Sequence, residues 1–278
     1  MRFFTLMALI SLILCGCQSS PQGRANTAQE IAGTLMTKKT IAASPFIITT
    51  YEHIEKPGST ATIYIEGDGL AWLGRRTPSL DPTPLDPMPL KLATLDPAEN
   101  RIYMARPCQY SKTVHRGICE QKYWTSHRFA PEVIQSMNAA LDDIKNRNNL
   151  TDFNLVGFSG GGAVAVLMAS SRTDILSIRT IAGNLDHDRL NAIHRVTPMP
   201  GSLNAATFAP RVAHIPQHHF IGGKDTVVTP PVYHSYRAAA GPSTCIRHTL
   251  LPQATHEKGW TERWTGLLQA PLDCNVIN

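Results

Sequence analysis

The chain has 278 residues, of which 42% are hydrophobic and 17% are charged, and this is the composition of a globular protein with one sizeable core. Its formal net charge is +5, but the basic residues are scattered and form no block of like charges. A nucleic-acid-binding surface needs such residues clustered on one face, so we expect no nucleic-acid partner.

The first residues have the pattern of an export signal. Arg2 is followed by an apolar run over residues 3–14 that is interrupted by Thr5 and Ser11. A run of about a dozen residues is too short to span a bilayer stably, but it suits the hydrophobic region of a signal peptide. We therefore expect residues 1–16 to be a cleaved signal peptide.

A cysteine pair follows the apolar run and indicates a lipid anchor. The stretch Leu14-Cys15-Gly16-Cys17 resembles a bacterial lipobox, in which a cysteine is lipidated and becomes the new N-terminus. Acyl chains on Cys17 would hold the protein at a membrane, because each buried methylene adds about 0.8 kcal/mol. We expect residues 17–44 to form a lipidated N-terminus with a flexible polar tether. The expected location is the bacterial cell envelope, on the periplasmic face of the outer membrane. A plain secretory signal cleaved nearby is the alternative.

Beyond residue 45 the chain alternates between predicted strands and predicted helices. Runs of β-branched, aromatic and apolar residues indicate strands, and an apolar face at helical spacing indicates a helix over 130–147. This alternation predicts one α/β domain over residues 45–278, with a mostly parallel central sheet and helices on both faces. A proline-rich loop (75–90) and an irregular segment (184–217) are expected to form loop insertions or a small cap. The predicted strands are 46–54, 61–67, 101–107, 153–158, 175–183, 218–223 and 246–252, and the further helices are 161–172, 230–241 and 261–270.

Four cysteines remain after export, namely Cys108, Cys119, Cys245 and Cys274. An even number in an oxidising compartment allows two disulfides with three possible connectivities. We favour Cys108–Cys119, which closes a short loop, and Cys245–Cys274, which ties down the C-terminal segment; free buried thiols are the alternative. The sequence has no CxxC motif and no Cys/His cluster with zinc-ligand spacing, so we expect no metal site.

A serine lies between glycines at the junction of a predicted strand and a predicted helix. Residues 157–161 read Gly-Phe-Ser-Gly-Gly and match the pattern G-x-S-x-G. The match alone is weak, but a strand leading in and a helix leading out are the context that a nucleophile elbow requires. In that geometry Ser159 projects above the sheet edge. The backbone N–H of Gly160, at the start of the helix, then points to where an oxyanion would form.

A serine hydroxyl needs a base and an orienting acid before it becomes a good nucleophile. Asp225 follows the strand 218–223, and His256 lies in the loop after the last predicted strand. Both positions lie at the carboxyl ends of strands, where open α/β sheets hold their sites. We therefore predict Ser159 as nucleophile, Asp225 as acid and His256 as base. The competing acids are Asp186 and Asp188, and the competing histidines are His187, His194, His214, His218 and His219.

The loop after the second predicted strand is expected to complete the oxyanion hole. It reads YIEGDGLAW over residues 64–72, and the N–H of Asp68 or Gly69 is the candidate second donor. A tight turn without a chemical role is the alternative. Because a carboxylate beside an oxyanion would oppose catalysis, we expect the Asp68 side chain to point away and brace the loop. Trp72 is expected to be either the floor of an acyl pocket or a buried core residue.

Residues 45–270 resemble the α/β-hydrolase superfamily, and more narrowly a group of exported bacterial hydrolases. The resemblance lies in the segments IYIEGDGLAW, SLDPTPLDP, RPCQY, YWTSHRFAPEV, LVGFSGGGAVA, AGNLDH and HFIGGKDTVV. It implies the same triad of Ser159, Asp225 and His256, the 67–69 loop and Gly160 as oxyanion hole, and no metal or organic cofactor. Glu66 departs from the family pattern, because many members have histidine there.

The resemblance implies hydrolysis of an ester, thioester or amide through an acyl-enzyme. A carboxylesterase that acts on a small acyl substrate is the simplest expectation. A serine peptidase or an acyltransferase on the same residues is the alternative chemistry. A non-catalytic envelope lipoprotein that uses the fold for binding is the alternative class, and it predicts a mispositioned His256, since a fold by itself guarantees no reaction.

Overall fold

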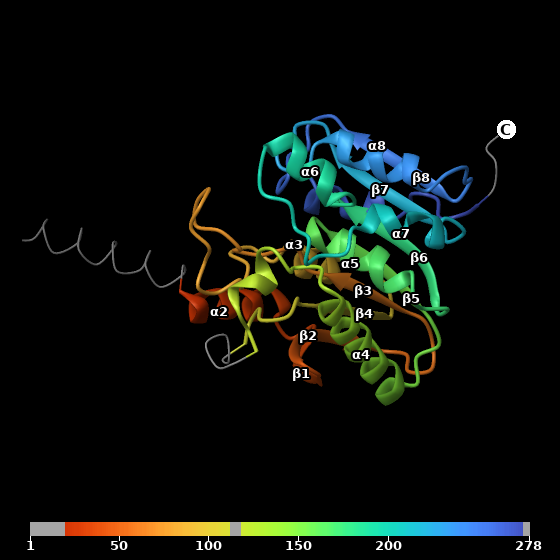
Figure 1. Ribbon diagram of the computed structural model, residues 1–278. Coiled ribbons are helices and arrows are strands. Elements are labelled where there is room, and N and C mark those ends of the chain that lie inside the picture. The colour runs from red at the N-terminus through yellow and green to blue at the C-terminus, as the bar shows by residue number, and fades with distance from the viewer. Residues whose placement is uncertain (1–19, 112–117, 275–278) are drawn as a thin grey trace, which may run out of the picture.

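The apolar strands of the sequence pair into one eight-stranded sheet in the computed structural model, which describes residues 20–111 and 118–274 (Figure 1). The sheet order is β1-β2-β4-β3-β5-β6-β7-β8. The six strands from β4 to β8 in this order are parallel, whereas β2 runs antiparallel to β1 and to β4. The strands are β1 (Thr37–Ala43), β2 (Phe46–Ile54), β3 (Ala61–Ile65), β4 (Asn100–Met104), β5 (Phe153–Phe158), β6 (Ile175–Ile181), β7 (Gln217–Gly222) and β8 (Ile246–Leu251).

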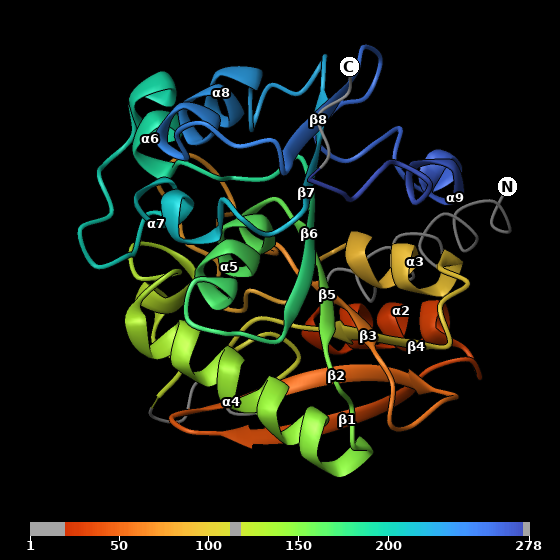
Figure 2. The same cartoon turned by 90° about the vertical axis from the view of Figure 1, so that its right-hand side faces the viewer.

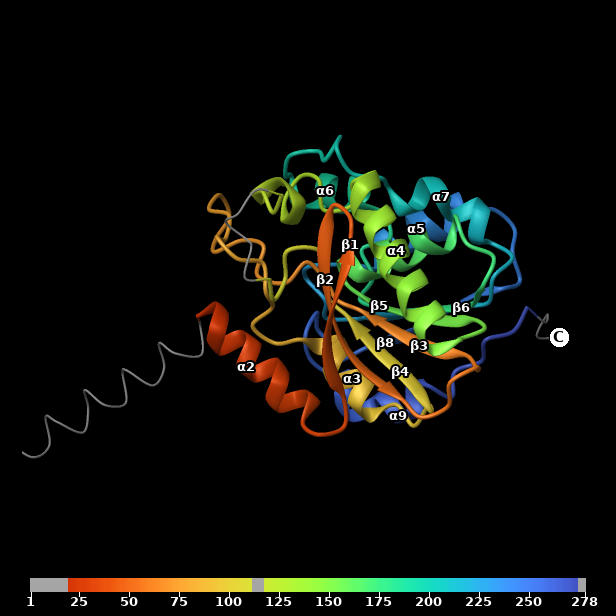
Figure 3. The same ribbon diagram turned by 90° about the horizontal axis from the view of Figure 1, so that it is seen from below.

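Helices cover both faces of the sheet, as the alternation of elements predicts. Figures 2 and 3 show α4, α5 and α7 on one face and α2, α3 and α9 on the other. Among the described residues, no helix has the length and apolarity to cross a bilayer. The helices are α2 (Pro21–Ala32), α3 (Met88–Leu95), α4 (Pro131–Asn148), α5 (Gly160–Ala169), α6 (His187–His194), α7 (Ala205–Val212), α8 (Pro230–Ala239) and α9 (Trp264–Leu267), with short 3-10 helices η1 (Gln121–Trp124) and η2 (Thr261–Arg263).

Each face of the sheet has its own hydrophobic core. Met137 of α4 and Val164 of α5 belong to one core, while Leu90 of α3 and Trp264 of α9 belong to the other. Every residue of α5 is buried, which explains why this helix is small and apolar throughout rather than amphipathic. The two cores hold the carboxyl ends of the central strands rigidly, and those ends carry the candidate site.

The expectation of a flexible tether is wrong for residues 21–43, which form a helix and a strand. Residues 21–32 form α2, whose first turn is capped by Ser20 through a 3.0 Å hydrogen bond from the Gly23 N–H. Residues 37–43 form β1, which pairs with β2 along its whole length. The short polar sequence of α2 has little helical signal of its own, and burial of Ala28 and Ala32 against the second core stabilises it instead. The predicted signal peptide and Cys17 lie outside the described residues.

Two further segments contain more regular structure than expected. The proline-rich loop ends in α3, which begins at Met88 and carries Pro89 in its first turn, where a missing N–H costs no hydrogen bond. The segment 184–217 contains α6 and α7, which are only eight residues each.

The four cysteines form the two favoured disulfides, Cys108–Cys119 and Cys245–Cys274.

Candidate active site

Ser159 lies in the sharp turn between β5 and α5. Its backbone has φ 50° and ψ −120°, a strained conformation for a residue with a side chain. The turn brings the two elements so close that a Cβ on Gly157 would lie 2.3 Å from the carbonyl oxygen of Gly161. A Cβ on Gly161 would in turn lie 2.3 Å from the carbonyl oxygen of Ile65. Glycine at both positions is therefore what allows the elbow to form.

The structure brings the three residues of the predicted triad together. The Nε2 atom of His256 lies 3.0 Å from Oγ of Ser159, and its Nδ1 atom lies 2.8 Å from Oδ2 of Asp225. With the proton on Nδ1 and donated to Asp225, Nε2 is free to accept the serine proton. The three residues follow β5, β7 and β8, so the parallel strands place them at one edge of the sheet.

Hydrogen bonds with the backbone hold Asp225 and His256 in position. Oδ1 of Asp225 accepts the N–H groups of Val227 and Val228 at 2.7 and 2.8 Å, which leaves Oδ2 for the imidazole. The indole N–H of the buried Trp260 donates to the carbonyl oxygens of His256 and Thr255 at 3.0 and 3.1 Å. Sequence reasoning missed Trp260, although a tryptophan four residues after a predicted base was the available signal.

The competing residues have other partners. Asp186 caps α6 by accepting the Arg189 N–H and also accepts hydrogen bonds from Ser235 and Asn204. His219 is buried in β7, and burial lowers its pKa to about 3. In the residues the structure describes, none of the remaining candidates hydrogen-bonds to Ser159; these are Asp188, His187, His194, His214 and His218.

The loop after β3 lies beside the serine and presents backbone donors. A Cβ on Gly67 would lie 3.4 Å from Cβ of Ser159. The Gly67 N–H already donates to Oε1 of Glu66 at 2.8 Å, which leaves Asp68 and Gly69 as candidates in this loop. Across residues 20–111 and 118–274, no acceptor is hydrogen-bonded to the N–H of Asp68, Gly69 or Gly160. These are the three donors that the sequence predicts for an oxyanion hole.

Comparison with known proteins identifies the fold. No family model and no curated protein sequence matches the chain. Among solved structures, the Pyrococcus furiosus esterase Pf2001 is similar with a TM-score of 0.57 and 14% identity, over 87% of this chain and 92% of that chain. Est1E from Butyrivibrio proteoclasticus is similar with a TM-score of 0.55 and 13% identity, over 83% of this chain and 97% of that chain. The chain has the α/β-hydrolase fold.

A third neighbour with this fold is much longer than the chain. Puromycin hydrolase has a TM-score of 0.57 and 13% identity, and the match covers 82% of this chain but 37% of that chain. The α/β-hydrolase fold of this protein therefore corresponds to less than half of that enzyme, whereas it spans nearly the whole of both esterases.

The orientation of Asp68 differs from the expectation that its side chain points away from the site. A Cβ on Gly160 would lie 2.2 Å from Oδ1 of Asp68, so the carboxylate lies against the start of α5. Two guanidinium groups offset its charge: that of Arg128 is 2.5 Å from Oδ2, and that of Arg106 is 3.6 Å from Oδ1. The two arginines lie in RPCQY and YWTSHRFAPEV, two segments that carry the family resemblance, but sequence reasoning assigned neither arginine a role.

Glu66, where many members of the resembled family have histidine, supports the same loop through hydrogen bonds of its carboxyl group. Its carboxyl group is fully buried, accepting the Gly67 N–H on Oε1 and the Tyr103 hydroxyl on Oε2 at 2.9 Å. Burial raises the pKa of Glu66 to about 8, so the group is largely protonated at neutral pH. Trp72 is not a buried core residue, because 41% of it is exposed.

Proposed function

We propose that this protein is a serine hydrolase that cleaves a carboxylic ester through an acyl-enzyme. The observation that carries the proposal is the continuous hydrogen-bonded line from Asp225 through His256 to Ser159. A backbone-anchored carboxylate orients the imidazole, and the imidazole removes the hydroxyl proton as the oxygen attacks.

The geometry supports a two-step reaction. The Ser159 oxygen bonds to the carbonyl carbon as its proton moves to Nε2 of His256, and the carbonyl oxygen becomes an oxyanion. We assign the stabilisation of that charge to the N–H groups of Gly160 and of Asp68 or Gly69. The ester C–O bond then breaks, and the alcohol leaves with the proton from His256. Water, deprotonated by the same imidazole, releases the acid and regenerates the serine.

The lengths of the structural neighbours favour an esterase over a peptidase. The two esterases match over 92% and 97% of their own chains, whereas the match to the Pyrococcus horikoshii acylaminoacyl peptidase covers 40% of that chain. The non-catalytic alternative requires a mispositioned His256, and the 3.0 Å contact with Ser159 argues against it.

We also propose that the protein is exported and held in the cell envelope by lipid on Cys17. The support is the lipobox-like sequence and the two disulfides, which suit an oxidising compartment. Mass spectrometry of the N-terminal peptide purified from membranes tests the proposal. A diacylated or triacylated Cys17 is expected, and an unmodified N-terminus elsewhere would contradict it.

A fluorophosphonate probe tests the chemistry directly. The probe should label the wild-type protein on Ser159, and Ser159→Ala should abolish both labelling and turnover of short p-nitrophenyl esters. Ser171→Ala is the matched control, because Ser171 is exposed just beyond the other end of α5. Turnover that persists in Ser159→Ala would rule the mechanism out. Product analysis with a peptide substrate and with an alcohol acceptor separates the peptidase and acyltransferase alternatives.

A further inference from the structure

A short finger of exposed apolar and basic residues projects from the loop that carries the oxyanion donors. The finger comprises residues 72–77 and is closed by a bridge between Trp72 and Pro78 and by a 2.8 Å hydrogen bond from the Leu73 N–H to the Thr77 carbonyl. Trp72 is 41% exposed and Leu73 is 63% exposed. Adjacent exposed side chains of this size favour contact with another apolar surface over contact with water.

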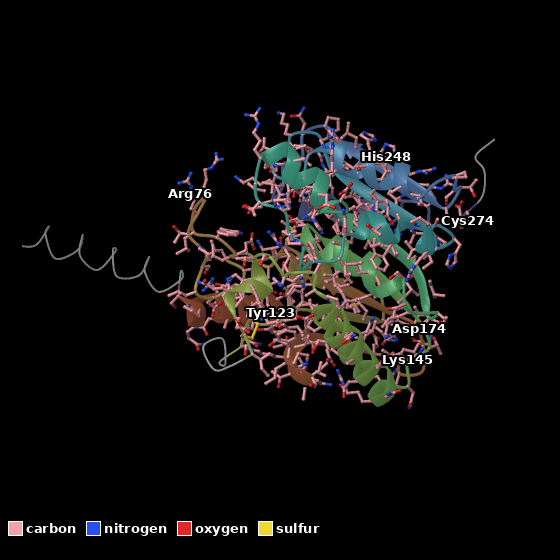
Figure 4. The ribbon with its side chains drawn as sticks, viewed as in Figure 1. Arg76, Tyr123, Lys145, Asp174, His248 and Cys274 are labelled. Carbon is pink, nitrogen blue, oxygen red and sulfur yellow. A yellow bond between two sulfur atoms is a disulfide. The ribbon has the colours of Figure 1, made fainter. Side chains whose placement is uncertain are left out.

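The finger combines the residue types that favour a bilayer surface. Tryptophan concentrates at the boundary between lipid headgroups and acyl chains, and leucine gains from burial in the acyl region. Arg75 and Arg76 are exposed at the tip, where they can reach anionic headgroups. Figure 4 shows Arg76 projecting from the tip of the finger away from the sheet.

The N-terminal helix is fastened to the base of the same segment. Arg24 of α2 is buried and donates to the carbonyl oxygens of Asp81 and Thr83 at 3.2 and 2.6 Å. One of its nitrogens also lies 3.4 Å from the Asp81 carboxylate. Because α2 cannot swing away without breaking these contacts, the start of the described chain is held near residues 81–83, at the base of the segment that carries the finger.

The chain outside the structure is too short to separate this surface from an anchor. Cys17 precedes Ser20 by three residues, which span at most about 11 Å when fully extended. In Figures 1 and 3 the N-terminal end of α2 and the finger lie on the same side of the molecule. A lipid on Cys17 would therefore bring the bilayer to that side.

We propose that the finger formed by residues 72–77 docks on the lipid bilayer in which the N-terminal anchor is embedded. The inference rests on the anchored form of the proposed function. Anchor and finger together would hold the protein in one orientation on the membrane, with the loop after β3 next to the bilayer, instead of leaving it on a free tether.

Tryptophan fluorescence tests the docking, because Trp72 is the exposed one of the four tryptophans and the other three are at most 4% exposed. The full-length protein, expressed with its own N-terminus, is reconstituted into phosphatidylcholine–phosphatidylglycerol vesicles with or without brominated acyl chains. Brominated lipid is expected to quench the emission, and Trp72→Phe should lose that quenching. Arg75→Glu/Arg76→Glu should reduce it at least about two-fold on anionic vesicles, since its charges are reversed.

Leu73→Asp tests the apolar contribution of the finger to docking, and Leu176→Asp is its matched control. Leu176 is 48% exposed at the start of β6, the opposite end of the parallel strands from the candidate site. Leu73→Asp should reduce the quenching of Trp72, and Leu176→Asp should leave it unchanged. Vesicle-bound wild-type protein whose emission is unchanged by brominated lipid would overturn the docking. A failure of the wild-type protein to sediment with vesicles would instead overturn the lipid anchor and, with it, the docking that rests on the anchor. Fluorophosphonate labelling of the same samples keeps this outcome separate from the esterase proposal.

Discussion

The carboxylate of Asp68 lies against the α-carbon of Gly160, so close that a Cβ there would meet Oδ1 at 2.2 Å. Gly160 is also the first residue of α5 and a candidate oxyanion donor. A negative charge at this place would raise the energy of a developing oxyanion if it were not offset. The paired guanidinium groups of Arg106 and Arg128 provide that offset.

Removal of Arg128 should therefore slow the chemical step more than it weakens substrate binding. We expect Arg128→Gln to lower kcat about ten-fold with little change in KM, since the charge near the oxyanion is then only partly offset. Arg128→Lys should restore part of the rate. Arg172→Gln is the control, because Arg172 pairs with Asp142 and Asp174 instead. Equal kcat values for Arg128→Gln and wild type would show that the pair is structural only.

Asp225→Asn should abolish the proposed hydrolase activity while leaving the fold intact. The amide cannot hold the imidazole in the tautomer that accepts the serine proton, and a loss of about 10⁴-fold in kcat is expected. For Asp186→Ala we expect the opposite: loss of the N-cap of α6 costs about 1 kcal/mol of stability, with kcat within about two-fold of wild type. Steady-state kinetics and urea denaturation of both variants would distinguish the two acids, and a reversal of these results would assign the acid to Asp186.

Trp260→Phe should loosen the loop that carries the base. The change removes the N–H donor to His256 and Thr255 but keeps most of the buried ring, so we expect kcat to fall about ten-fold in a folded protein. Trp264→Phe is the matched control, because its indole N–H donates to Tyr64 rather than to this loop. A similar fall in kcat for both variants would indicate a general effect of core disruption.

Because the pKa of Glu66 is raised on folding, its titration should lower the free energy of unfolding as the pH rises. Its pKa is raised from 4.5 to about 8 on folding, so between these pH values the native state holds a proton that the unfolded state has lost. The free energy of unfolding should then fall by up to about 1.4 kcal/mol per pH unit from this group alone. Glu66→Gln keeps the shape and removes the titration. Urea denaturation between pH 5 and pH 8 should give a smaller slope for the variant, and equal slopes would refute the raised pKa.

Local sequence determined the central strands and the elbow. β5 and the helix after it follow from an apolar run that meets glycines at 157 and 161, because only glycine permits so close a crossing of the two backbones. The alternation of strands and helices likewise predicts a parallel sheet with its site at the carboxyl ends of the strands. These features depend on residues close in the chain, which is why pattern alone reveals them.

Only the tertiary structure decided the contacts between residues that are far apart in the chain. His256 is 97 residues from Ser159, and Arg128 is 60 residues from Asp68, so no spacing rule links either pair. The direction of the Asp68 carboxylate and the helical structure of residues 21–32 come from packing between such segments, and so does the contact of His256 with Asp225 that the sequence predicts. The sequence by itself therefore determined which residue types the site uses, and only the folded sheet decided which of them meet, because side chains far apart in the chain converge only when the strands are stacked in order.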